Sequence, residues 1–393
     1  MERRQVLQLL AASGLSITSL AAGAAAPANA STPAGKRRAP AGTASCLGPA
    51  TEGSQPLPQE TAELEHLYRK ALQAGGKLTI WAGGDAPNQQ DTLKGKLQKR
   101  FPDLEITLQV RLSKEHDVEI DKRIAEGGVL PDVTMLQTSH DFENWKAQDR
   151  LLPFKPLGVR QQFPGYADPD GAFLAANMYA FFPMYAKDGV EGSPSAYPDF
   201  LQPQYKEHLI LTFPHDDDAV LYVYDKMITQ YGEDFLDQLA AQKPHFVRGT
   251  AAPAVMVGTR GYLGNLTGRT ARANEPSRSY IPGKDWFISW TQRAAVFREA
   301  PNTDAGKLFL AYVASKEYQS SYGGWRTRQD LTPPAGMQPL SSYGNTDPLD
   351  FLAWMRDRQH IDALKERMTS VFGPVTGESP LTDPELLAIL GLG

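Results

Sequence analysis

The sequence predicts an α/β protein with two lobes, each a mixed, mostly parallel β-sheet flanked by helices. Two observations predict this class. Short apolar stretches typical of buried strands alternate with amphipathic stretches at helical spacing, which is the pattern of a mostly parallel sheet. The chain has 393 residues, of which 41% are hydrophobic and 22% charged. That composition is ordinary for a globular protein, and the length suffices for two lobes of about 150 residues each.

The first 30 residues have the features of an export signal. Arg3 and Arg4 precede an apolar run over residues 6–26, and a small-x-small cleavage signature ends at Ala30. An arginine pair before a moderately apolar run is typical of a twin-arginine signal, with the general secretory route as the alternative. We therefore expect cleavage near Ala30 and a periplasmic or secreted mature protein.

Residues 31–60 are rich in Ala, Pro, Gly, Ser and Thr, so we expect a flexible linker there. Cys46 is the only cysteine, which excludes an internal disulfide, and we interpret it as an inert thiol. The formal net charge is −5 at pH 7. Because the chain has no long basic run, this charge argues against a nucleic-acid partner. We expect a monomer without a cofactor.

The folded part is expected to begin with an amphipathic helix over residues 61–73, ended by a glycine pair. The alternation then predicts, in order, a strand at 77–81, a helix ending near 101, a strand at 105–110, a helix at 118–126 and a strand at 131–136. Strands separated by helices in this way lie parallel in one sheet. This segment is therefore the first lobe.

Residues 171–187 are aromatic and strand-like, and we expect them to cross into a second lobe that spans residues 176–289. A return strand is expected within residues 286–298. The later helices, including those near 348–358 and 361–372 and a short docking helix at Leu386, are expected to pack on the first lobe. The predicted first lobe is therefore discontinuous, with residues 61–175 and 290–393.

One late segment resembles a known family. Residues 298–322, REAPNTDAGKLFLAYVASKEYQSSY, combine a turn, a capped amphipathic helix and a second helix start at Ser315. They match the pattern "APxxxAxKLFLxYxxSxExQ" of bacterial extracellular solute-binding proteins, the type II periplasmic binding proteins of ABC importers. Residues 193–206 resemble a second segment of the same family, and the resemblance covers roughly residues 68–322. The subgroup contains the ferric-ion, thiamine and phosphonate-type binders.

The resemblance implies an exported component of an ABC transporter that closes two lobes, hinged on two crossover strands, around a small-molecule or ion ligand. Its membrane partner would be an ABC permease. The chain has no adjacent pair of tyrosines, the phenolate pair with which the ferric-ion binders hold iron. No metal site is predicted.

Candidate ligand-binding residues follow from position in the fold. In open α/β sheets, ligands bind beyond the carboxyl ends of strands, where loops meet helix N-termini. Three groups qualify: Gly83, Gly84 and Asp85; Thr138, Ser139 and His140; and His215, Asp216 and Asp217. The alternative interpretations are a tight turn for the first group, a helix cap for the second, and capping with solvent exposure for the third.

Four further residues complete the candidate site. Tyr179 and Trp290 lie in the crossover segments, where they would stack against an organic ligand, although such aromatic residues are more often core. Tyr322 and Arg326 would contact an anion. The neighbouring Arg328 and Asp330 would form a structural ion pair instead.

The sequence contains no G-x-S-x-G elbow, P-loop or H-E-x-x-H motif, so no enzyme activity is predicted. A hydrolase on the same scaffold, and a secreted protein that keeps the binding fold without a transport role, are the alternative functions.

Overall fold

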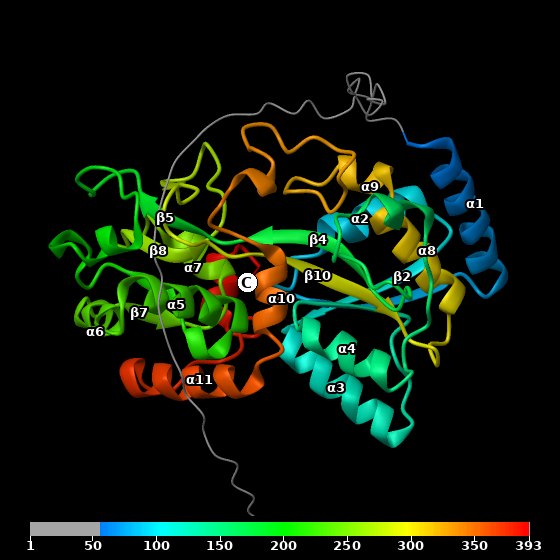
Figure 1. Ribbon diagram of the computed structural model, residues 1–393, viewed down its shortest axis with the longest axis horizontal. Helices are drawn as coiled ribbons and strands as arrows, with labels where there is room; N and C mark the ends of the chain where they lie inside the picture. The colour runs from blue at the N-terminus through cyan, green and yellow to red at the C-terminus, as the bar shows by residue number, and fades with distance from the viewer. Residues whose placement is uncertain (1–55, 393) are drawn as a thin grey trace, which may run out of the picture. The chain divides into compact units, whose positions relative to one another are not determined.

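The computed structural model describes residues 56–392 and shows an α/β fold whose mixed sheets are flanked by helices, as the sequence predicts (Figure 1). The predicted signal peptide and Cys46 lie outside the described residues. Among residues 56–392, no helix is both long enough and apolar enough to cross a membrane.

The first lobe is built on a five-stranded sheet in the order β2-β1-β3-β10-β4. Strands β1, β2 and β3 are parallel, and β10 runs antiparallel to both of its neighbours. The parallel strands are those that the sequence separates by helices, as the βαβ connection requires. The bounds are β1 Lys77–Gly83, β2 Glu105–Arg111, β3 Val133–Leu136, β4 Leu174–Ala180 and β10 Ser289–Val296.

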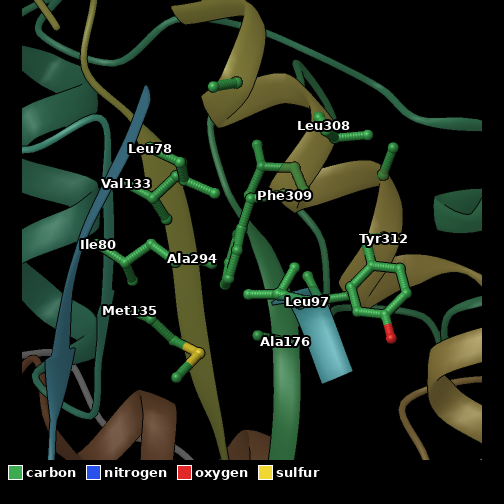
Figure 2. Close-up of a cluster of buried hydrophobic side chains, with 14 of the residues drawn as sticks. Leu78, Ile80, Leu97, Val133, Met135, Ala176, Ala294, Leu308, Phe309 and Tyr312 are labelled. Carbon is green, nitrogen blue, oxygen red and sulfur yellow. The ribbon is translucent and has the colours of Figure 1, made fainter. Parts of the chain in front are cut away.

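Helices cover both faces of this sheet. Successive strand residues point to opposite faces. Ile80 of β1 accordingly joins the buried cluster under α1, α2 and α8, whereas Trp81 joins the one under α3 and α4. Figure 2 shows the first cluster, where Phe309 of α8 projects toward side chains of β1, β3 and β10. The helices are α1 Pro58–Gln73, α2 Asp91–Arg100, α3 Ser113–Glu126, α4 Ser139–Ala147, η1 Leu157–Gln161, α8 Thr303–Ala314 and α9 Lys316–Ser320.

The second lobe contains a three-stranded sheet, β8-β5-β9, and a two-stranded sheet, β6-β7. Strands β6 and β7 are parallel to each other, whereas β8 and β9 both run antiparallel to β5. The predicted mostly parallel order therefore holds in the first lobe and not in this three-stranded sheet. The strands are β5 Phe182–Ala186, β6 Ile210–Thr212, β7 His245–Val247, β8 Gly264–Gly268 and β9 Ser277–Ser279.

Most helices of this lobe are short, and α5 and α11 are the long ones. They are η2 Tyr197–Leu201, η3 Pro203–Tyr205, η4 Pro214–Asp216, α5 Asp218–Tyr231, α6 Asp234–Ala241 and α7 Ala251–Met256, followed late in the chain by η5 Leu340–Ser342, α10 Pro348–Trp354, α11 Arg358–Phe372 and α12 Pro384–Ile389. One residue, Phe181, separates the end of β4 from the start of β5, so the chain changes sheet there. It returns to the first sheet with β10, and these two segments form the hinge.

The prediction that the C-terminal helices pack on the first lobe is wrong for α11 and α12, whereas α10 contacts both β10 of the first sheet and α5. Helices α10 and α11 contact α5, and Phe351, Met355 and Ile361 share a buried cluster with Tyr222 and Val223 of that helix. Helix α12 contacts α7. The chain therefore crosses between the lobes a third time, after α9. The amphipathic pattern identified the buried faces correctly, but it does not say which lobe covers them.

The N-terminal helix begins earlier than predicted, at Pro58 inside the expected linker. Proline is favoured at the first helical position because the N–H that it lacks would have no intrahelical partner there. Glu60, on the first turn, is 5% exposed and accepts hydrogen bonds from Arg328 at 2.8 Å and from the Lys316 N–H at 2.7 Å. The Arg328–Asp330 ion pair, at 2.8 Å, is also present.

Candidate functional site

A cleft with a volume of about 830 Å³ lies between the two lobes. The first lobe contributes the loop after β1, the first turn of α3 and the loop after β3. The second lobe contributes η4, the start of α5 and the start of α7. Residues of β4, β8, β10 and α11 also line it. The loops at the carboxyl ends of β1 and β3 thus occupy the position where α/β sheets bind ligands.

Nine of the thirteen predicted site residues line this cleft: Gly84, Asp85, Thr138, His140, Tyr179, His215, Asp216, Asp217 and Trp290. The other four do not. Gly83 ends β1 so close to α3 that an added Cβ would lie 2.2 Å from the Ser113 hydroxyl oxygen. Ser139 is 1% exposed at the start of α4.

Tyr322 and Arg326 make local structural contacts instead of facing the cleft. The Tyr322 hydroxyl donates to the Met178 carbonyl at 2.8 Å. The Arg326 guanidinium lies 3.4 Å from the carbonyl oxygens of Ser320 and Gly324. The structure therefore places these two residues outside the predicted site, because the Tyr322 side chain bonds to β4 and the Arg326 side chain turns back toward carbonyls at and just after the end of α9.

Within residues 56–392, three polar contacts join cleft-lining residues of the two lobes, and we call them the cross-cleft contacts. In the first, the Asp85 carboxylate accepts from the N–H and hydroxyl of Thr250 and from the N–H of Ala251. The hydroxyl bond is 2.8 Å and the Ala251 bond 3.1 Å. A carboxylate is well suited to this place because it accepts several hydrogen bonds from the exposed N–H groups of a helix start.

The other two cross-cleft contacts begin on α3 and on the loop after β3. The Lys114 ammonium donates to the Asp216 carbonyl at 2.6 Å and to its carboxylate at 2.5 Å. The Gln137 amide donates to the Asp217 carboxylate at 3.0 Å. Lys114, Gln137 and Thr250 were not predicted. The strand-end rule that selected Asp85 and Thr138 also covers Gln137 at the end of β3 and Lys114 after β2, so it could have found both.

The acidic run 216–218 is held by the protein itself. Burial raises the pKa of Asp216, but Arg248 and Lys114 outweigh burial and hold the pKa below its ordinary value. Asp218 behaves in the same way, with Lys365 and Arg358 as its partners. Asp217 caps α5 by accepting from the N–H groups of two residues that follow it. Burial raises the pKa of Asp217 to about 6, and these N–H groups act in the opposite direction.

The two cleft histidines are neutral near pH 7. Burial, followed by the charge of Arg358, lowers the pKa of His140 to about 4. Burial also lowers the pKa of His215. Among residues 56–392, no group of three or more His, Cys, Asp or Glu side chains is arranged to hold a metal ion.

A second acidic group borders the cleft. Asp117 of α3 lines it, and burial raises the pKa of this residue. Burial and repulsion from Asp117 together raise the pKa of Asp141. The two carboxyl groups therefore carry fewer than two negative charges near neutral pH, because charging both in a buried place is costly.

Aromatic rings from the hinge strands form the floor of the cleft. Tyr179 and Trp290 are opposite one another in the β4–β10 pair, and their rings are nearly parallel at 24° with centroids 5.6 Å apart. Phe181 lies at the junction between β4 and β5 and also lines the cleft. Its ring centroid lies 4.8 Å from that of Trp290. We call Tyr179, Phe181 and Trp290 the aromatic floor.

No protein-family model matches the sequence, and no curated protein matches it. Solved structures do share the fold. The substrate-binding protein of an ABC transporter from Agrobacterium tumefaciens superimposes with a TM-score of 0.66 at 14% identity, and the match covers 76% of this chain and 94% of that one. The periplasmic binding protein AfuA from Actinobacillus pleuropneumoniae, with fructose-6-phosphate bound, gives 0.61 at 14% identity and covers 75% and 98%.

Iron-bound HitA from Pseudomonas aeruginosa gives a TM-score of 0.59 at 13% identity and covers 74% of this chain and 99% of that one. Each of the three structures is matched over nearly its whole length, so the likeness extends over both lobes. Sequence identity this low shows a shared fold only. The chain has the two-lobed fold of the periplasmic binding proteins.

Proposed function

We propose that this protein is the exported solute-binding component of an ABC importer and captures a small solute by closing its two lobes. The cleft carries this proposal. It has a volume of about 830 Å³ and is bounded by loops of both lobes, and a cleft of that size encloses a small organic molecule. A solute bound there would contact both lobes at once and so stabilise the closed arrangement.

The hinge supports closure as the mechanism. The lobes are linked through the β4–β5 junction, through β10 and through the segment after α9. Small backbone rotations at such element ends suffice for hinge closure. The cross-cleft contacts join polar groups that would be exposed to water when the lobes separate. They therefore stabilise the closed arrangement even without a solute, and a bound solute stabilises it further.

The candidate site residues divide into two roles in this proposal. Asp85, Asp216 and Asp217 hold the lobes together, because their carboxylates are bonded to the opposite lobe. The aromatic floor contacts the solute. Binding without catalysis is part of the proposal, and in the described part of the chain the side chains of His140 and His215 have no hydroxyl partner that could serve as an activated nucleophile.

The proposed partner is an ABC permease in the membrane, with the solute-binding protein acting as a monomer. The export-signal features of residues 1–30 favour a periplasmic or secreted location. The Agrobacterium protein is described as the substrate-binding protein of an ABC transporter, which is the role proposed here.

Thermal melts against a solute panel test the proposal. The panel contains ferric iron with a chelator control, thiamine, polyamines, phosphonates, sulfate and small sugars. A solute at a hundredfold its Kd stabilises a protein by about 2.7 kcal/mol. The variant Ala251→Trp places an indole in the cleft lining, whereas Ala74→Trp adds the same group at an exposed position at the end of α1.

We expect a stabilising solute to act on the wild type and on Ala74→Trp, and to lose its effect on Ala251→Trp. Equal stabilisation of both variants would show that the solute binds outside the cleft and would contradict the proposal.

A further inference from the structure

The charged side chains of the cleft are largely occupied by the protein's own contacts. Lys114 is bonded to Asp216 at 2.5 Å, and Arg358 and Lys365 to Asp218 at 3.0 and 2.6 Å. Arg269 forms a two-point contact with Glu275, at 3.0 and 2.7 Å. A charged solute would have to break such pairs and leave one partner poorly compensated, which costs more free energy than the new contact returns.

The acidic groups give a solute no better access. The Asp85 carboxylate is bonded to three donors of the second lobe, and the Asp217 carboxylate caps α5. Asp117 and Asp141 already repel one another. Both belong to the first lobe, on α3 and α4, so they could attract a charged solute from one side of the cleft only. Charge is therefore a weak basis for recognition in this cleft.

The aromatic floor, in contrast, is available. Tyr179 and Phe181 are partly exposed and line the cleft, while Trp290, 4% exposed, supports them from β10. Offset or nearly parallel rings attract one another beyond the area they bury. A planar ring laid on Tyr179 would continue the stack that this residue already forms with Trp290, and the Phe181 ring, tilted at 60° to Trp290, offers a second aromatic face beside it.

Two polar groups beside the floor have no partner in the described residues. They are the indole N–H of Trp290 and the side-chain carbonyl of Gln292, which is also 4% exposed. The two residues lie two positions apart on β10, so their side chains point to the same face, and both line the cleft. One is a donor and the other an acceptor, and buried groups of this kind are normally satisfied. A ring edge that carries both an acceptor and a donor would match them after small side-chain rotations.

We propose that the solute carries an uncharged heteroaromatic ring, which stacks on the aromatic floor and turns its polar edge toward Trp290 and Gln292. This inference rests on the proposed function and names its class of solute. The cleft volume of about 830 Å³ accommodates a compound of nucleoside size. Saturated sugars lack the planar face, and phosphorylated solutes must compete with acidic partners for Lys114, Arg269, Arg358 and Lys365.

Calorimetric titration of the full chain with five probes tests the inference. Adenosine, uridine and nicotinamide represent uncharged heteroaromatic rings, glucose a saturated uncharged solute and fructose-6-phosphate a charged one. Phe181→Leu keeps an apolar side chain but removes the aromatic face, and Phe181→Tyr keeps the face. Phe163→Leu is the matched control at a residue that is 36% exposed and outside the cleft lining.

We expect at least one heteroaromatic probe to bind, with an affinity reduced about tenfold by Phe181→Leu and unchanged within twofold by Phe181→Tyr and Phe163→Leu. Binding of glucose or fructose-6-phosphate alone would overturn the inference and leave the proposed function standing. Heteroaromatic binding that Phe181→Leu does not weaken would overturn the stacking site. If no probe bound the folded protein, the inference would fail and the proposed function would lose support.

Discussion

Replacing Asp85 with alanine removes the cross-cleft contact that has the most hydrogen bonds. Its carboxylate accepts from the N–H and hydroxyl of Thr250 and from the N–H of Ala251. A hydrogen bond to a charged group contributes about 1.5–3 kcal/mol. The site is half-buried and the freed donors regain water when the lobes separate, so we take about 2–4 kcal/mol for the whole contact.

That free energy corresponds to a shift of about 30-fold to 1000-fold in the equilibrium between closed and open lobes, because 1.4 kcal/mol is a factor of ten. Small-angle X-ray scattering of the solute-free protein should therefore give a larger radius of gyration for Asp85→Ala than for the wild type. The solute affinity should also fall, since the solute must then supply more of the free energy of closure.

A matched substitution separates closure from a general effect of losing a carboxylate. Asp149 pairs with Arg298 inside the first lobe and is 83% exposed, so Asp149→Ala should leave the radius of gyration unchanged. Thr250→Val removes only the hydroxyl bond and should give a smaller shift than Asp85→Ala. If Asp85→Ala and the wild type scattered identically, the Asp85 contact would not hold the lobes together and the reasoning would be refuted.

Three further predictions concern stability. Arg328→Met should lower the free energy of unfolding in urea by about 3–5 kcal/mol, because it leaves the 5% exposed Glu60 without its cation. Gly158→Ala should destabilise the folded protein, because its Cβ would lie 2.3 Å from a backbone carbonyl oxygen of α8. Gly95→Ala in α2 has open space around its Cβ, so it should stabilise the folded protein by about 0.5–1 kcal/mol. His116→Phe should flatten the pH dependence of stability between pH 6.5 and 4.

The sign of the last prediction follows from linkage. Burial lowers the pKa of His116 from 6.5 to about 4, so the unfolded chain binds more protons than the folded one between these values. The free energy of unfolding then falls as the pH falls through this window, by on the order of 2–3 kcal/mol, and a phenylalanine cannot take part. If His116→Phe had the same dependence of stability on pH as the wild type, this prediction would be contradicted. Equal stabilities of the two glycine variants, or a loss below 1 kcal/mol for Arg328→Met, would contradict the other two.

Local pattern was sufficient to predict many elements near the site. Ser315 was expected to cap a helix, and its hydroxyl accepts from the Tyr318 N–H at 3.1 Å. The rule that ligands bind beyond strand ends selected Gly84, Asp85 and Thr138, all of which line the cleft. These successes share a cause, because caps and strand ends depend on residues adjacent in the sequence.

Long-range packing was not predictable from the same patterns. Phe351 of α10 contacts the second lobe through Tyr222, with ring centroids 5.3 Å apart, but its helical period is the same whichever lobe covers it. The partners of Asp85 and Lys114 lie 165 and 102 positions away in the chain. Tyr322 failed as a site residue for the same reason, since its hydroxyl bonds to a carbonyl of β4 144 positions away.

The central claim is that the lobes close on a solute, and the distance between the lobes tests it most directly. Dyes attached through Lys70→Cys on α1 and Lys206→Cys in the second lobe, both exposed, with Cys46→Ser removing the only native cysteine, report that distance by energy transfer. The solute that stabilises the protein most in thermal melts is titrated into the wild type and into Asp85→Ala. The account predicts that both reach the same short distance at saturation, with Asp85→Ala starting from the longer one. A solute that binds in the cleft while neither distance changes would contradict it.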